Sequence, residues 1–263
     1  MKFIITKKQS KRLIKEALGV PTAVNLWVDT FSSLIKDGLL MLLSSDDQEI
    51  FFNGDEVQNK VVSLGWNSSN KNFKSFPLAE PNLNLTINVV PDSQIKKGDD
   101  YIQNASFDTS DMDIREATFD DGLTTTLFVG GTINIEISIP KSSYDNGDFV
   151  ELYDKDIKPY AEAVLFHELT HVVEFYNRVI SGTATPNFEQ VSNLTQMLNK
   201  MGSIDDWDEL MFLIYLHLSF ELNARVSEVY GLLRNKQINS KDEFIEFLKN
   251  SRAFSYAKRL KNF

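Results

Sequence analysis

Two of the three histidines in this 263-residue chain stand four positions apart, and a glutamate follows the first of them. They are His167, Glu168 and His171, within the stretch 164–173. Four residues are close to one helical turn, so in a helix both imidazoles leave the same face and could bind one metal ion. A catalytic zinc ion takes three protein ligands and keeps a fourth position open for water. Glu168, at the edge of that face, could accept a proton from this water without binding the metal.

The residues that flank this motif are uncharged and mostly apolar, as expected for a helix that is buried except for its metal face. The stretch resembles the active-site helix of the zincin metallopeptidases. It departs from the metzincin branch, because Glu174 and Asn177 stand where that branch needs a glycine and a third histidine. The segment 221–225, with Glu221 followed one turn later by Ala224, is similar to the gluzincin branch. This resemblance implies a catalytic Zn²⁺ held by His167, His171 and Glu221.

The third ligand has two candidates on one predicted helix. His217 and Glu221 are four residues apart and therefore share a face. If Glu221 binds zinc, His217 could stand behind one of the zinc ligands or help to hold the oxyanion. The oxyanion role is also open to Tyr215 and Tyr230. The alternative for His217 is an ordinary buried histidine with its hydrogen bonds satisfied.

The composition limits the class of protein and its partners. With 42% apolar residues the chain can bury a sizeable core, and its net charge of −10 argues against nucleic acid as a partner. It has no cysteine, and therefore no disulfide framework. The first residues lack the apolar run of a signal peptide, and the longest apolar run, 39–43, is too short to cross a bilayer. We expect a soluble cytoplasmic protein that acts on a peptide or protein substrate, without a membrane partner.

Capping residues and apolar periodicity predict helices through much of the chain. The expected ranges are 6–18, 22–37 ended by Gly38, one from about Asp156 or Pro159 to 181–182, 188–201, 207–233, and a C-terminal pair that begins at Ser240 with Glu243.

Alternating apolar residues predict the strands. Residues 39–43 and 48–52 are expected to pair about a turn, 84–90 to form one strand, and 124–140 to form a hairpin-like segment with Gly130 and Gly131 between its halves. The range 54–81 reads as loop. Peptidases often hold an extended substrate along a sheet edge. The strand 131–139 is the candidate for that edge, with an ordinary buried strand as the alternative.

An acidic run separates the two strand regions, between Asp99 and Asp121. Clustered carboxylates could bind calcium. The run lacks the glycine and terminal glutamate of a calcium loop, so a solvated surface is the better interpretation.

These observations predict an α+β, zincin-like fold. An N-terminal α/β lobe (1–150) would carry the substrate-edge strand, and a helical lobe (151–263) would carry the metal site at the junction, within one catalytic domain. We expect a zinc-dependent peptidase with Glu168 as the general base. The alternatives are a zincin-like regulatory or binding protein with little peptidase activity, and a structural protein with a degenerate site.

Overall fold

The computed structural model describes a defined part of the chain, which comprises residues 22–42, 47–65, 78–96, 98–118, 124–180, 219–234, 236, 240–251 and 254–255. The helices expected at 6–18 and 188–201 lie outside these residues, as do Tyr215 and His217. The described part contains helices and mixed sheets, which confirms the expected α+β class.

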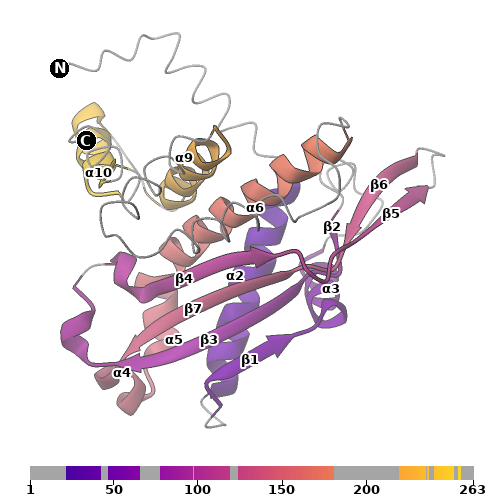
Figure 1. The fold of residues 1–263 in the computed structure, drawn as a ribbon. Helices are drawn as coiled ribbons and strands as arrows, with labels where there is room; N and C mark the ends of the chain where they lie inside the picture. The colour runs from indigo at the N-terminus through magenta and orange to yellow at the C-terminus, as the bar shows by residue number, and fades with distance from the viewer. Residues whose placement is uncertain are drawn as a thin grey trace, which may run out of the picture.

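A four-stranded sheet forms the centre of the fold (Figure 1). Its order is β1 (Glu49–Phe52), β3 (Asn82–Val90), β7 (Thr132–Pro140) and β4 (Ile102–Asp108). The central strands β3 and β7 run parallel, whereas β1 and β4 are antiparallel to their neighbours. The strand expected at 84–90 is therefore confirmed as part of β3.

The prediction that 131–139 forms a sheet edge is wrong. The strand β7 lies inside the sheet, because it pairs with β3 on one side and with β4 on the other.

The two faces of this sheet differ in polarity. Side chains alternate along a strand, so every second residue of β3 and β7 points to the same face. One face carries buried aliphatic residues, namely Leu83, Leu85, Ile87, Ile133, Ile135, Ile137 and Ile139. The other face carries polar pairs in register, such as Asn84 beside Asn134, whose amide groups are 3.4 Å apart. The apolar face therefore forms the core, and the helices pack against it.

A smaller sheet contains β2 (Leu78–Ala79), β6 (Thr124–Val129) and β5 (Asp113–Thr118), in that order. The expected hairpin at 124–140 is wrong, because β6 and β7 belong to different sheets. Gly130 and Gly131, with φ of 85° and 84°, redirect the chain between them. Glycine adopts this left-handed conformation without steric strain. A Cβ on Gly131 would also lie 2.5 Å from the Phe107 ring.

Of the helices that the structure describes, four pack against the central sheet, namely α2 (Thr22–Leu42), α3 (Gly54–Ser63), α4 (Lys141–Asn146) and α6 (Lys158–Ile180). The other described helical elements are α5 (Phe149–Leu152), the π-helical turn η4 (Tyr153–Ile157), α9 (Ser219–Arg234) and α10 (Lys241–Lys249), with 3₁₀ turns η2 (Asp92–Gln94) and η3 (Gly98–Tyr101) before β4. Figure 1 shows α2 and α6 behind the sheet, and α9 beside α6.

Two local predictions near α2 are wrong. The helix continues past Gly38 to Leu42, so residues 39–42 are helical rather than a strand. Leu39 and Leu42 are buried there, and tertiary packing outweighs the weak helix propensity of Gly38. The range 54–81 is not loop throughout, since α3 begins with a capping box between Asn53 and Glu56. Asn at the N-cap with Glu three residues later is a helix-start signal that the sequence already contained.

The C-terminal and acidic regions agree better with expectation. Ser240 caps α10 by accepting a hydrogen bond of 3.1 Å from the Glu243 amide. In the acidic run, Asp108, Asp111, Asp113 and Glu116 are exposed on or near β4 and β5, as the interpretation of a solvated surface requires. Among the helices of the described residues, none combines the length and the apolar character needed to cross a membrane.

Candidate metal centre

The helix α6 carries the motif and is buried on several sides. It continues directly from α5 and the π-helical turn η4, and Pro159 stands in its first turn. Ala161, Leu165, Phe166, Leu169 and Val172 are buried in the core. The helix packs against α2, β4 and α9. The motif's apolar flanks therefore anchor the helix, as the sequence predicted, and its polar side chains lie between β4 and α9.

The two histidines of the motif face each other. The Nε2 atoms of His167 and His171 are 3.1 Å apart, and the ring planes stand at 86°. His167 is buried, with 6% of its surface exposed, and His171 is half-buried. Two imidazole nitrogens this close can share a proton or a metal ion. A tetrahedral zinc with Zn–N bonds of about 2.0–2.1 Å would separate two ligand nitrogens by about 3.3–3.4 Å. The pair therefore fits a zinc ion after a shift of a few tenths of an ångström.

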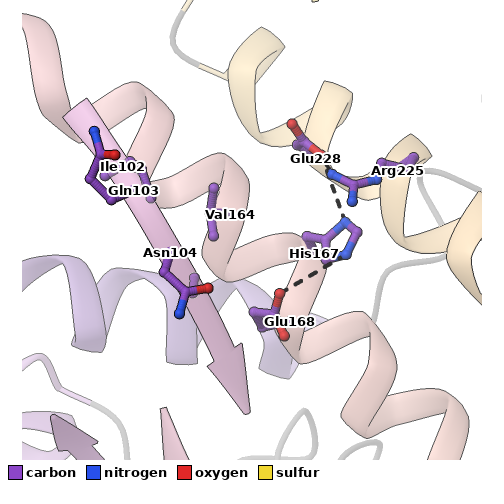
Figure 2. Close-up of a pocket in the computed structure, with 9 residues that line it drawn as sticks. Ile102, Gln103, Asn104, Val164, His167, Glu168, Arg225 and Glu228 are labelled. Atoms are coloured by element: carbon purple, nitrogen blue, oxygen red, sulfur yellow. Dashed lines mark hydrogen bonds and ion pairs between the residues drawn. The ribbon is translucent and has the colours of Figure 1, made fainter. Parts of the chain in front are cut away.

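Glu168 lies beside this pair, as predicted. Its Oε1 is 4.0 Å from Nε2 of His167, and the side chain is 14% exposed. The carboxylate therefore lies on the Nε2 side of the His167 ring (Figure 2). A water between these groups would be within reach of a carboxylate acting as a base.

A carboxylate that the sequence reasoning missed lies on the other side of the His167 ring. Oε2 of Glu228, on α9, is 3.7 Å from Nδ1 of His167, and the Glu228 side chain is only 6% exposed. Arg225 holds the same carboxylate oxygen at 2.8 Å. Histidine ligands commonly direct their second nitrogen to a carboxylate, which orients the ring and makes the metal-binding nitrogen more basic. Glu228 stands in this position relative to His167 (Figure 2).

The signal for Glu228 was present in the sequence. Glu228 follows Glu221 by seven residues, or two helical turns, on the helix that was expected to supply the third ligand. Sequence alone did not show which turn of that helix meets His167, because this depends on how α6 and α9 pack.

A recess of about 180 Å³ opens at this site, between β4, α6 and α9. Its walls are residues 102–105 of β4 on one side, with Val164, His167, Glu168, Arg225 and Glu228 opposite (Figure 2). In the described part of the chain, β4 pairs with β7 alone and is thus an edge strand. The edge beside the motif is β4, rather than the strand 131–139 that the sequence reasoning favoured.

The other candidate residues are placed as follows. Glu221 lies on α9, of which only the backbone is described at this position. Tyr230 is half-buried and packs edge-on against Phe166, with ring centroids 5.3 Å apart. Its role with the oxyanion stays a prediction, as does any role of His217, which lies outside the described residues. Within the side chains that are described, no group of three or more His, Cys, Asp or Glu residues is placed to hold a metal.

The described geometry thus consists of two convergent imidazole nitrogens, a carboxylate beside them, a second carboxylate behind one ring, and a recess along an edge strand. Comparison of the chain with protein-family models, with curated proteins and with solved structures found no match.

Proposed function

We propose that this protein is a zinc-dependent metallopeptidase, with a zincin-like site at the recess between β4, α6 and α9. The observation that carries the proposal is the 3.1 Å separation of the His167 and His171 Nε2 atoms on one face of a buried helix. This distance lies near the value that two nitrogen ligands of one tetrahedral zinc require.

The third ligand that we propose is Glu221. Gly231 of α9 lies against Ala163, and Glu228 lies against His167, so α9 runs antiparallel to α6 at this contact. Ala224 comes four residues before Glu228 and therefore lies at the level of His171 on α6. Glu221 lies about one turn closer to the start of α9. Ala224 is fully buried, and its small side chain allows close approach of the helices there. The register thus brings Glu228, and not Glu221, against His167, so the proposal of Glu221 rests on the resemblance of the segment 221–225 to the gluzincin branch.

The chain's own residues divide the chemistry among them. A zinc ion at the histidine pair would lower the pKa of a bound water to about 7 and polarise the carbonyl of a scissile bond. Glu168 would accept the proton of the attacking water and deliver it to the leaving amine. Glu228, held by Arg225, would keep the hydrogen of His167 on Nδ1, so that Nε2 presents its lone pair.

The substrate would lie along β4. Edge strands bind extended peptides through main-chain hydrogen bonds, as if the peptide were a further strand. Gln103 and Asn104 are exposed on β4 where it borders the recess, and the register of β4 against β7 shifts between Ile102 and Asn104. Bulges of this kind are frequent next to active sites, where they redirect side chains and main chain.

The test is a cleavage screen of the full chain loaded with zinc, on a mixed-peptide library, with and without a chelator. We expect cleavage that the chelator abolishes and that zinc restores. Glu168→Gln should keep the zinc but lose activity by about 10²–10⁴-fold, because the general base is removed. Glu151→Gln, an exposed glutamate on α5, is the matched control and should retain activity.

The outcomes separate the possible functions. A Glu168→Gln protein with full activity would contradict the mechanism. Stoichiometric zinc uptake without cleavage of any library peptide would favour a regulatory or binding protein built on the same site. A chain that cannot take up zinc would leave a structural role only.

A further inference from the structure

A second cavity adjoins the same helix one to two turns before the histidines. It has a volume of about 390 Å³ and lies between α2, the π-helical turn η4 and the first turns of α6. None of its lining residues lines the recess at His167. Volumes of this order are typical of sites for small molecules. The cavity is therefore a separate candidate site, independent of the proposed peptidase function.

The floor of the cavity consists of buried polar side chains. Ser32, Tyr153 and Glu162 are 3%, 1% and 3% exposed. The Tyr153 hydroxyl donates to the Ser32 carbonyl at 2.8 Å and lies 3.0 Å from Ser32 Oγ. Ser32 Oγ in turn lies 3.5 Å from Oε1 of Glu162. Burial raises the pKa of Tyr153 well above its usual 10.0, so its hydroxyl keeps its proton. A network of this kind, contributed by α2, η4 and α6, holds the Glu162 carboxylate in a defined place.

The rim of the cavity carries charges of both signs. Lys158 approaches Oε1 of Glu162 at 3.8 Å, and Lys36 pairs with Asp154. Both lysine side chains are about two-fifths exposed, at 42% for Lys158 and 39% for Lys36. The opening thus carries two ammonium groups together with the carboxylates of Asp154 and Asp29, the latter paired with Arg234. A further carboxylate, that of Glu162, stands at the floor.

This distribution of charge selects a class of ligand. A phosphate or other anion would meet the carboxylates of Glu162 and Asp154, and a metal ion would meet the two ammonium groups of the lysines. A molecule with an ammonium group at one end and a carboxylate at the other matches both parts of the site. Charge-assisted hydrogen bonds of this kind are the strong ones in proteins.

We propose that this cavity binds a free α-amino acid, with the ammonium group at Glu162 and Ser32 and the carboxylate at Lys36 and Lys158. The ligand's ammonium would donate to the Glu162 carboxylate at the floor, and its side chain would occupy the remaining volume. A π-helical turn brings Tyr153 and Asp154 to the cavity. This agrees with a functional site, because π-helical turns are rare in proteins overall but are often found at functional sites.

The test is isothermal titration calorimetry of the full chain without zinc, with each standard amino acid at up to about 10 mM, a range that detects millimolar dissociation constants. We expect at least one amino acid to bind. Its analogue without the amine and its analogue without the carboxylate should each bind at least about tenfold more weakly, since each lacks one charged contact. Absence of binding by every amino acid would overturn the proposal, and so would equal binding of either analogue.

Two variants assign the binding to this cavity. Glu162→Gln and Lys158→Gln should each weaken binding about tenfold or more by removing one anchoring charge. Lys141→Gln is the matched control, because Lys141 is an exposed lysine on α4 that pairs with Asp145. Should Glu162→Gln fail to fold, Lys158→Gln decides alone, since that lysine is on the rim. Unchanged affinity in Lys158→Gln, or an equal loss in Lys141→Gln, would contradict the assignment.

Discussion

Helix α6 carries two polar sites that differ in the kind of side chains they bring together. At His167 and His171, two groups of the same kind face each other, and both can act as electron-pair donors. At Glu162, the chain supplies groups of opposite character, namely the Lys158 ammonium and the Ser32 hydroxyl. At the first site, a shared proton or the zinc ion that we propose would bridge the two nitrogens. The second is already balanced by its own side chains, so a ligand there must replace existing contacts.

The comparison also shows how each site is assembled. The histidine pair comes from one turn of one helix, and its geometry follows from the spacing of two residues. The Glu162 site joins α6 to Ser32, a residue 130 positions away in the chain. A local site of the first kind can be recognised in a sequence, whereas the second kind exists only after α2 and α6 have packed.

The largest effect that we expect comes from removing either ligand of the pair. His167→Ala or His171→Ala should abolish stoichiometric zinc binding, because one nitrogen cannot hold the ion with the remaining ligands. Metal analysis after dialysis against zinc measures this, and Glu168→Gln serves as the control that keeps its zinc. Retention of zinc by both alanine variants would show that the histidine pair is not the metal site, and the contrast drawn with the Glu162 site would fail.

A smaller effect is expected from the carboxylate behind His167. Glu228→Gln should weaken zinc affinity by about 10–100-fold, the usual cost of losing the partner that orients a histidine ligand. Competition with a chromogenic chelator would measure it. Glu246→Gln, on an exposed residue of α10, is the matched control. If Glu228→Gln instead lost zinc as completely as His167→Ala, Glu228 would be a ligand rather than an orienting group.

The contact between α6 and α9 provides a third test. A Cβ on Gly231 would lie 2.7 Å from Cα of Ala163 and 2.8 Å from the Phe166 ring. Gly231→Ala should therefore lower the free energy of unfolding by about 1–3 kcal/mol through overpacking. Glycine-to-alanine changes at open helical positions are stabilising instead, so the sign of the effect in urea denaturation is diagnostic. Stabilisation by this change would show that the helices do not pack closely here.

The smallest effect concerns Tyr153 and alkaline pH. Burial raises the pKa of this phenol in the folded state above its unfolded value near 10.0. The stabilising contribution is therefore complete below pH 10 and is lost as the pH rises further, by up to about 1.4 kcal/mol per pH unit. Tyr153→Phe should reduce this loss. Urea denaturation of both proteins from about pH 9 to about pH 11, a range that brackets the unfolded-state pKa, would measure how steeply the free energy of unfolding falls with pH in each. Equal slopes would contradict the account of a buried, neutral tyrosine.

Several features of the fold were predictable from local patterns alone. The strand 84–90, the helix that carries the motif and the Ser240 cap followed from alternation, helical spacing and capping residues, and the structure confirms them. The capping box at Asn53 and Glu56 is an equally local signal for the start of α3, although the weak apolar periodicity of the range 54–81 predicts loop. The hairpin expected at 124–140 failed because two positive-φ glycines can turn a chain back or send it into another sheet.

The sequence by itself determined the spacing of His167, Glu168 and His171, and with it the convergence of both imidazoles on one helix face. The tertiary structure alone decided that β4 rather than β7 is the edge beside them, that Glu228 and Arg225 stand behind His167, and that Ser32 meets Glu162. The physical reason is the range of the interactions. Helical geometry relates residues within a turn, whereas strand order and helix packing depend on burial of apolar faces that are distant in the chain.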